Sequence, residues 1–335
     1  MRSSPEFDLI AAIRDRLGGR ADRPEVRIGI GDDAAVVEEP GGGGRAVSID
    51  AVVDGVAFRR SWCPPRAIGR KAAGAALSDL AAMGAEPAEL YVWLGVPEDF
   101  PRDDALELCD GLADLAESTG AVLLGGDLTG SPVLSVAVTA IGQTSAPGDM
   151  VGRAGAEPGD AVCVTGTLGG AAAGLMLLEH PELAEGIPGG AADAARARQL
   201  EPRPQIAAGR GLAAAGATAM IDVSDGLGAE AEHLAAASGA GIEIEVDLVP
   251  AGSGVAEVAA AAGRDPIELV VSGGEDYELL CAIPRARLAE CMDAVAATGA
   301  ELTEIGRVHP GAAVRLRLPG GRSVRPGGHD HFRGP

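Results

Sequence analysis

Seven aspartates in short runs of small residues are the side chains of this sequence best suited to chemistry. Asp and Gly are each depleted from strands, so every run predicts a point where a strand ends or a helix begins, and α/β folds bind ligands at such points. Together the seven predict one ligand site that is lined by carboxylates. They are Asp32 and Asp33 in GIGDDAAVV, Asp50 in AVSID, Asp79 in ALSDLAAMGAEP, Asp127 in LLGGDLTGS, and Asp222 and Asp225 in MIDVSDG.

A site lined by carboxylates indicates the binding of a polyphosphate through metal ions. Clustered carboxylates repel one another and need cations, and hard oxygen ligands without His or Cys favour Mg²⁺ over zinc. Any one of these aspartates alone is more often a turn residue or a helix N-cap. The metal interpretation therefore depends on the whole set.

Two further motifs leave their alternatives open. LLGGD at 123–127, placed directly after an apolar strand, allows backbone N–H groups to approach a phosphate. SGGEDYEL at 272–279 places Glu275 and Asp276 beside two glycines, either as a tight turn or as an acidic contact with a ligand. The pattern GxxxxGK[ST] is absent, which excludes a Walker-type nucleotide site.

Side chains for covalent catalysis are not indicated. The sequence has no GxSxG, and its five histidines lie in helix-like or tail segments without a partner pattern. Phosphoryl transfer needs little beyond positioning and cationic stabilisation of the transferred oxygens. Metal-loaded aspartates and one or two arginines supply both.

The elements that position these residues alternate between strands and helices in the first half of the chain, which predicts an α/β domain. A helix is predicted at 6–17, where Phe7, Ile10, Ile13 and Leu17 share one face. The pattern then predicts strands at 47–50, 90–94, 122–125 and 133–141, and helices at 65–83 and 103–118.

Residues 143–159 are rich in Gly, Pro and Ala without periodicity, and we place a domain boundary there, giving domains 1–148 and 149–335. The tail from Pro319 is either a lid or a frayed end. Between the boundary and the tail the pattern predicts strands at 161–165, 217–222, 242–246, 279–283 and 304–308, helices at 170–178, 204–214, 226–237 and 285–297, and a loop around 188–190.

Composition bounds the class of protein. A length of 335 residues favours two domains, and 47% hydrophobic residues with only 2% aromatics predict aliphatic cores. The net charge of -22 repels nucleic acid and anionic membranes. Five cysteines without a CxxC pair fit a reducing cytosol, and neither a signal peptide nor a membrane helix is predicted. We therefore expect a cytoplasmic protein.

The motifs, in their order and spacing, resemble the thiamine-monophosphate kinases of the aminoimidazole ribonucleotide synthetase superfamily, from PEFDLI near residue 5 to HDHF near residue 332. The resemblance implies two domains: an N-terminal domain with a dimer-forming sheet and a C-terminal α/β domain. It also implies a homodimer that transfers the γ-phosphate of ATP directly to the phosphate of thiamine monophosphate. The products are thiamine diphosphate and ADP, and the reaction uses Mg²⁺.

Carried over residue by residue, the resemblance implies a complete site. Glu275 contacts the thiamine-bearing substrate, and Lys71 is assigned to neutralising phosphate charge, as a catalytic residue beside Asp127 and Asp225. ATP contacts fall on Gly126, Asp127, Arg153 and Ser224. The implied Mg²⁺ ligands are Asp33, Ser48, Asp50, Asp79, Asp127, Asp222 and Asp225.

The sequence departs from the family pattern mainly on the acceptor side. Ala57 replaces a histidine associated with substrate, Gly130 replaces an arginine, and Ala76 replaces an asparagine before SDLAAMG. Near the C-terminus, Pro326 best matches a position where the family often has an aromatic residue. These departures leave the range of acceptors open.

Alternatives within the superfamily fit less well. A selenophosphate synthetase is expected to carry a reactive Cys in an N-terminal loop, whereas the first cysteine here is Cys63, and a hydrogenase-maturation dehydratase ends in cysteine, whereas this chain ends HFRGP. Ala57 and Gly130 leave open a non-catalytic nucleotide or thiamine-phosphate binding protein. A pure binder has no need of so many mutually repelling carboxylates, which favours the kinase.

Overall fold

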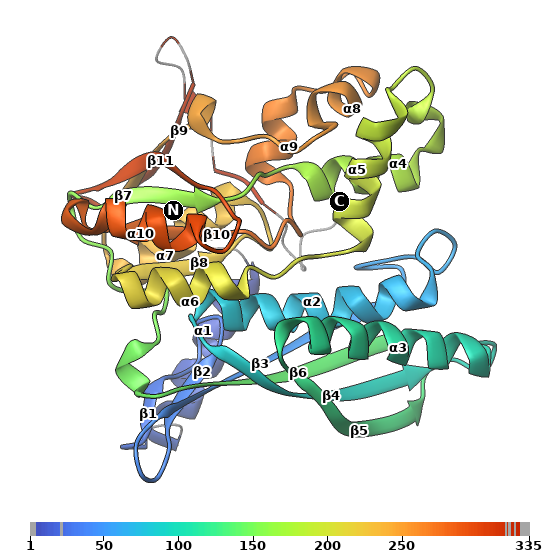
Figure 1. Cartoon of the computed structure of the whole chain (residues 1–335), viewed down its shortest axis with the longest axis horizontal. Coiled ribbons are helices and arrows are strands. Elements are labelled where there is room, and N and C mark those ends of the chain that lie inside the picture. Colours follow the sequence, from blue (N-terminus) through green and yellow to red (C-terminus); the bar gives the residue numbers. More distant parts are fainter. Residues whose placement is uncertain (1–4, 21–22, 319, 321–322, 325, 329–335) are drawn as a thin grey trace.

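The computed structural model describes residues 5–20, 23–318, 320, 323–324 and 326–328, and it contains two β-sheets (Figure 1). The first half of the chain forms α1 (Pro5–Leu17), β1 (Val26–Ile28), β2 (Ala35–Glu38), β3 (Gly44–Val53), α2 (Pro65–Ala82), β4 (Glu86–Val96), α3 (Arg102–Thr119), β5 (Val122–Gly130) and β6 (Ser135–Thr144).

The N-terminal sheet has the strand order β1-β2-β3-β6-β4-β5, and its neighbouring strands are antiparallel except for β4 and β5. Helices α2 and α3 cover one face, and α2 lies between this sheet and the second half of the chain (Figure 1). A Cβ on Gly69 would lie 2.0 Å from the Leu108 carbonyl oxygen. Glycine at that position therefore lets α2 and α3 pack backbone to backbone.

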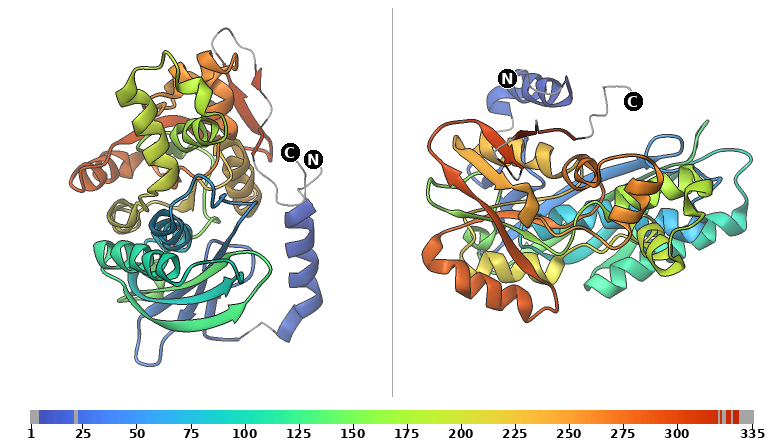
Figure 2. Two further views of the ribbon diagram at one scale, coloured as in Figure 1. Left: turned by 90° about the vertical axis from the view of Figure 1, so that its right-hand side faces the viewer. Right: turned by 90° about the horizontal axis from the view of Figure 1, so that it is seen from above.

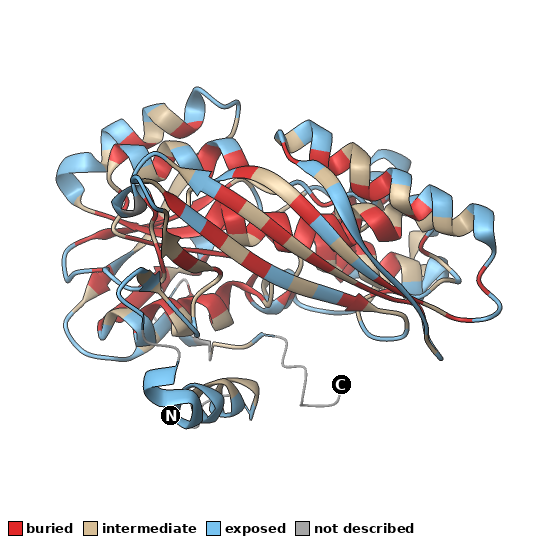
Figure 3. Ribbon diagram, turned by 90° about the horizontal axis from the view of Figure 1, so that it is seen from below, coloured by how far each residue is buried: buried red, intermediate tan, exposed pale blue. Residues whose placement is uncertain are grey.

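The opposite face of the N-terminal sheet is not covered by any element of the described chain (Figure 3). Ile49, Tyr91 and Trp93 lie on this face and are 73%, 37% and 39% exposed. Exposed large apolar side chains that share one sheet face are typical of an interaction surface.

The C-terminal sheet has the strand order β13-β12-β9-β11-β7-β10-β8, and only β9 and β12 are parallel neighbours. Helices α4, α5, α8 and α9 pack together beside it (Figure 1). The elements are β7 (Ala161–Thr165), α4 (Gly170–Glu179), α5 (Gly189–Leu200), α6 (Ile206–Ala215), β8 (Ala219–Asp222), α7 (Leu227–Ser238), β9 (Gly241–Glu245), α8 (Val255–Ala261), α9 (Pro266–Ser272), β10 (Leu279–Ile283), α10 (Leu288–Ala296), β11 (Leu302–His309), β12 (Val314–Arg317) and β13 (Ser323–Val324).

The predicted α/β class and the two sheet-containing halves are confirmed, and the long predicted helices and strands correspond to observed elements. The predicted loop around 188–190 is wrong, because Gly189 and Gly190 form the first turn of α5 after Pro188. The first N–H groups of a helix lack intrahelical partners in any case, so glycines are tolerated there. The pattern also missed the short strands β1 and β2, which offer too few alternating residues to be recognised.

The expectation that every aspartate run marks a strand exit or a helix start is wrong for three residues. Asp50 lies inside β3, Asp127 lies inside β5, and Asp79 lies in the last turn of α2. All ten residues of β3 pair with β6, and β5 pairs with β4 through Gly130. These ladders outweigh the low strand propensity of Asp and Gly.

Helix α1 lies to one side of the molecule (Figure 2) and has no buried residue. Its Phe7 ring stacks on His233 with 3.8 Å between ring centroids. Burial lowers the pKa of His233 to about 4, so this ring is neutral at pH 7. Most of the tail after Pro319, including His329 and His331, lies outside the described residues. Within the described residues, no helix is both long and apolar enough to cross a membrane.

Candidate functional site

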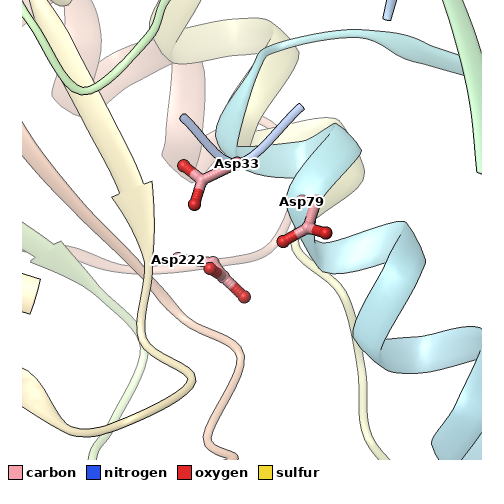
Figure 4. A group of neighbouring side chains, drawn as sticks. All are labelled: Asp33, Asp79 and Asp222. Atoms are coloured by element: carbon pink, nitrogen blue, oxygen red, sulfur yellow. The ribbon is translucent and has the colours of Figure 1, made fainter. Parts of the chain in front are cut away.

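Three aspartates from distant parts of the chain meet between the two halves of the molecule (Figure 4). We call Asp33, Asp79 and Asp222 the aspartate triad. Each offers one carboxylate oxygen, and these oxygens lie within 4.8 Å of one another. Asp33 lies in the turn before β2, Asp79 in α2 and Asp222 at the end of β8, so the triad forms only when both halves are folded.

Two hydroxyl groups hold the triad in place. Ser48 of β3 donates a hydrogen bond to Asp79, and Ser78 of α2 donates one to Asp222 over 2.6 Å. Both serines are buried. Sequence reasoning had predicted Ser48 but missed Ser78, although it directly precedes Asp79 in the SDLAAMG motif.

The triad is short of positive charge. Burial, followed by the charges of Asp222 and Asp33, raises the pKa of Asp79 well above its usual value. Burial and the Asp33 charge raise the pKa of Asp222 to about 8. The Asp33 Oδ2 atom is buried without a hydrogen-bond partner among the described residues. A group of buried carboxylates that resist ionisation, with one oxygen left without a donor, is suited to a bound cation.

Arg153 fixes the turn that carries Asp33. Its guanidinium forms an ion pair with the Asp33 carboxylate, and its backbone N–H donates to Asp32 Oδ2 over 3.1 Å. Because Arg153 pairs with Asp33, this predicted ATP contact lies directly beside the triad.

Glu230 orders the turn that contains Ser224 and Asp225. The Asp225 N–H donates to Glu230 Oε1 over 2.9 Å, and the buried Glu230 belongs to the first turn of α7. Sequence reasoning missed this residue. An acidic residue in the first turn of a helix that follows a small polar turn is a capping signal that could have identified it.

Two acidic residues of the SGGEDYEL motif, Asp276 and Glu278, make contacts within the protein. The Asp276 carboxylate accepts N–H groups of Gly169 and Ala171 over 2.5 and 3.0 Å, at the start of α4. Glu278 pairs with Arg198 and accepts the Thr165 hydroxyl over 2.7 Å. We call Asp276, Glu278 and Arg198 the carboxylate clamp, because it ties the motif to its neighbours.

Glu275, in the same motif, has partners outside the carboxylate clamp. Its Oε1 lies 2.6 Å from Lys71 Nζ of α2, and its Oε2 accepts the Gln199 side-chain N–H over 2.7 Å. Its φ of 67° is in the left-handed region, which non-glycine residues rarely adopt. Backbone conformations of this kind cluster at functional sites.

Most of the predicted site residues come together. The charge of Asp50 contributes to the raised pKa values of Asp79 and Asp222, and that of Asp225 contributes to the raised pKa of Glu230. Glu275 adjoins the same region, because its N–H donates to the Ser224 carbonyl over 2.7 Å.

Within a single chain, two of the predicted site residues, Gly126 and Asp127, lie away from the triad. The pairing places Gly126 in the same sheet row as Asp50, with β6 and β4 between them. Asp127 pairs in register with Trp93, and the Thr129 hydroxyl bonds to both side chains. Asp127 therefore lies on the uncovered face, at the far edge of the sheet from β3.

A cavity of about 640 Å³ opens at the start of α2, lined by residues that include Asp54, Arg60 and Phe100.

Three positions at which the sequence departs from the family pattern have different surroundings. Ala57 packs partly into the core. A Cβ on the diverged Gly130 would meet nothing within 4 Å. Pro326 lies against α7, next to Gly228.

Comparison with known proteins gives a consistent result over the whole chain. Residues 31–144 match the family "AIR synthase related protein, N-terminal domain", and residues 157–319 match its C-terminal domain. The thiamine-monophosphate kinase of Halobacterium salinarum is 39% identical over 291 residues, covering 87% of this chain and 91% of the relative. That of Salmonella typhimurium is 36% identical over 340 residues, covering 98% and 99%.

Solved structures agree with these relatives. The structure described as "AaThiL complexed with AMPPCP and TMP" is 33% identical, has a TM-score of 0.84 and covers 99% of both chains. The hydrogenase maturation protein HypE, at 19% identity and a TM-score of 0.70, shares the fold alone. The chain therefore belongs to the thiamine-monophosphate kinase family.

Proposed function

We propose that the aspartate triad and its neighbours hold Mg²⁺ and the phosphates of ATP, and that the γ-phosphate passes in line and directly to the acceptor. Membership of the family makes this chain an ATP-dependent kinase of thiamine monophosphate. The observation that carries the proposal is the meeting of Asp33, Asp79 and Asp222 in a site made of oxygen ligands alone.

The residues present fit a divalent cation. Asp33 Oδ2 is a buried acceptor without a partner among the described residues, and the raised pKa values of Asp79 and Asp222 show how poorly the protein alone supports their charge. When bound, Mg²⁺ supplies charge neutralisation of the phosphate oxygens. The proposed ligands are Asp33, Ser48, Asp50, Asp79, Asp222 and Asp225 of one chain, together with Asp127.

The side chains themselves position and screen the reactants. Arg153 pairs with Asp33 of the triad, and the Glu275 N–H donates to the Ser224 carbonyl. In this proposal Arg153 and Ser224 bind ATP phosphates, and Glu275 contacts the acceptor. Burial raises the pKa of the Cys63 thiol to about 12, so this thiol is protonated at neutral pH, which disfavours it as a nucleophile and supports direct transfer. Direct transfer depends on holding two anionic groups together.

Product analysis tests this function. Incubation with ATP, Mg²⁺ and thiamine monophosphate is expected to yield thiamine diphosphate and ADP in equal amounts, with no label retained on the denatured protein from γ-labelled ATP. Labelled protein would contradict direct transfer. ADP that accumulates equally without thiamine monophosphate would contradict the kinase assignment.

We also propose a homodimer in which Asp127 completes the site of the partner. Neighbouring strands lie about 4.8 Å apart, so three steps from β3 to β5 separate Asp50 from Gly126 by roughly 14 Å. Asp127 also lies on the other face of the sheet, beside the exposed Trp93. A second copy packed on the uncovered face would bury the apolar side chains and bring in its own Asp127.

Mixing two inactive variants tests the shared site. Asp127→Asn and Asp222→Asn are each expected to be inactive, and a mixture that exchanges subunits has one intact site in each mixed dimer. About a quarter of wild-type activity should return if dimers form at random. If Asp127 acted within its own chain, both sites of a mixed dimer would be defective, so a mixture without activity would contradict the shared site.

We further propose that the chain divides into units 1–148 and 149–335 and works in the cytoplasm. The strands of the two sheets fall on either side of residues 145–160. All five cysteines are unpaired, which suits a reducing compartment. Limited proteolysis that cleaves first within 145–160 would support the division.

A further inference from the structure

Lys71 is the single lysine of a chain whose other basic side chains are arginines. Arginine occurs along the whole sequence, yet at this position in α2 the chain retains a lysine. The Lys71 side chain is only 1% exposed. A buried lysine is costly unless it is paired, so its presence requires a partner and a reason.

The partner of Lys71 is Glu275, across the boundary between the two halves of the molecule. The Nζ to Oε1 distance is 2.6 Å. Beyond this ion pair, Lys71 Nζ has no hydrogen-bond partner among the described residues. The ammonium is compact, whereas a guanidinium is a wide planar fork that needs several acceptors. A single acceptor therefore suits the ammonium group of lysine better than the guanidinium group of arginine.

Glu275 is held from two sides. Lys71 binds Oε1 from the first half of the chain, and Gln199, itself 2% exposed, donates to Oε2 from the second half. The backbone is fixed as well, since the Glu275 N–H donates to the Ser224 carbonyl and φ is 67°. Yet the Glu275 side chain remains 26% exposed. A carboxylate fixed this firmly but still accessible is preorganised for a ligand.

We infer that Lys71 is a positioning residue of the kinase reaction, which acts through Glu275 by fixing its carboxylate where the acceptor binds. This inference rests on the proposed function, in which Glu275 contacts the thiamine-bearing substrate. Thiamine monophosphate carries a cationic heteroaromatic ring, and a carboxylate in a fixed place is its natural complement.

The geometry disfavours the role that the sequence suggested for Lys71. A residue that neutralises phosphate must reach an oxygen of the nucleotide, but Lys71 Nζ is enclosed and already faces Glu275. Burial, followed by the negative charges of Glu275, Asp50 and Asp222, raises the pKa of the Tyr277 hydroxyl well above its usual value. Glu275 therefore lies near other negative charges. Lys71 offsets that repulsion and keeps the Glu275 carboxylate in position.

A double-mutant cycle tests the inference, using Lys71→Met, Glu275→Gln and the double variant. Each single change is expected to raise the KM for thiamine monophosphate about tenfold or more while the KM for ATP stays within about twofold. Lys71→Arg should not restore the wild-type KM. The double variant should be no worse than Glu275→Gln, because Lys71 acts only through that carboxylate.

An exposed ion pair between the same two halves provides the matched control. Arg210 of α6 lies 3.0 Å from Glu86 of β4, and both side chains are about half exposed. Arg210→Met should leave both KM values unchanged, since exposed pairs contribute little. Thermal unfolding of every variant separates a loss of stability from a loss of acceptor binding.

If the wild-type protein makes thiamine diphosphate, three results would overturn the inference. They are independent effects of the two single changes, a rise in the KM for ATP equal to that for the acceptor, and full rescue by Lys71→Arg. If Lys71→Met alone does not fold, the double variant, which has no unpaired charge, is compared with Glu275→Gln, and a tenfold difference in acceptor KM contradicts the inference. A wild-type protein that makes no thiamine diphosphate would instead overturn the proposed function, and this inference with it.

Discussion

The aspartate triad and the carboxylate clamp are both buried groups of acidic side chains, and they differ in what the protein supplies to them. The two carboxylates of the clamp accept hydrogen bonds from two backbone N–H groups, a hydroxyl and the Arg198 guanidinium. The triad has two serine hydroxyls and one arginine, and it keeps a buried carboxylate oxygen without a partner among the described residues.

The pKa values differ in the same direction but by less, since burial also raises the pKa of Glu278 in the clamp, to about 7. Burial raises the pKa of Asp276 to about 6, although two backbone N–H groups and Arg198 oppose it. Burial and the Asp33 charge raise the pKa of Asp222 further, to about 8. Residue type and burial therefore do not distinguish a structural cluster from a ligand site. The supply of internal donors does, because a cluster that the fold leaves short of donors has capacity for a ligand.

Neutralising one member of the triad should have the largest effect. Asp222→Asn or Asp79→Asn is expected to lower turnover about a thousandfold or more, since each removes the charge of a proposed metal ligand without changing volume. Stability without metal should rise at neutral pH, because the change removes a buried carboxyl group whose ionised form the fold disfavours. Steady-state kinetics and thermal unfolding in EDTA check both. Near wild-type turnover in either variant would show that its residue is not a ligand.

Removing the cation of the carboxylate clamp should act in the opposite way on stability. Arg198→Met leaves the buried Asp276 and Glu278 carboxylates without their guanidinium partner, so we expect a loss of about 3 kcal/mol in the free energy of unfolding. Denaturant unfolding measures it. Arg264→Met, which breaks the exposed Arg264–Glu268 pair, is the matched control and should cost little. A clamp variant as stable as this control would end the distinction between the two clusters.

The pH dependence of stability sharpens the comparison further. The folded-state pKa values of Asp222, Asp276 and Glu278 are about 8, 6 and 7, all above their ordinary values near 4. The folded protein therefore binds more protons than the unfolded chain between pH 4 and 8, and its stability should fall as pH rises through that window. Thermal unfolding in EDTA at pH 5 and 8 tests the sign, and a higher melting temperature at pH 8 would contradict it.

Added Mg²⁺ should separate the contributions of the two clusters to that pH dependence. The cation competes with protons at the triad, so it should raise the melting temperature more at pH 8 than at pH 5. The carboxylate clamp already has its donors, so Glu278→Gln should leave this Mg²⁺ effect in place. An Asp222→Asn protein that still gains the full stabilisation would place the cation elsewhere.

The smallest effects are expected on the acceptor side. Space is available at Gly130, so Gly130→Arg should be accommodated, and Ala57→His restores a side chain typical of the family. Each is expected to lower the KM for thiamine monophosphate about twofold to tenfold, as for one added hydrogen bond, with the KM for ATP unchanged. A raised KM together with faster turnover of another phosphorylated acceptor would show a pocket remodelled for that acceptor.

The sequence predicted the fold and most of the site because its signals are local. Asp222 lies at the end of an apolar strand and Asp33 follows a glycine turn, so local patterns were enough to select both as candidates, and the structure brings them together. The pairing of Lys71 with Glu275 was not predictable, because it joins residues 204 positions apart, across two halves whose docking no local pattern encodes. The separation of Asp127 from the triad also escaped prediction, since it depends on the order of strands in the sheet.

Calorimetry of ATP binding with Mg²⁺ and with EDTA tests the central claim most directly. A chain of net charge -22 and a tetra-anionic nucleotide repel each other, and the aspartate triad adds local repulsion. ATP should therefore bind measurably only when Mg²⁺ is present, and Asp222→Asn should weaken that binding. Equal affinity for ATP in Mg²⁺ and in EDTA would show that the triad does not act through a cation and would contradict the account.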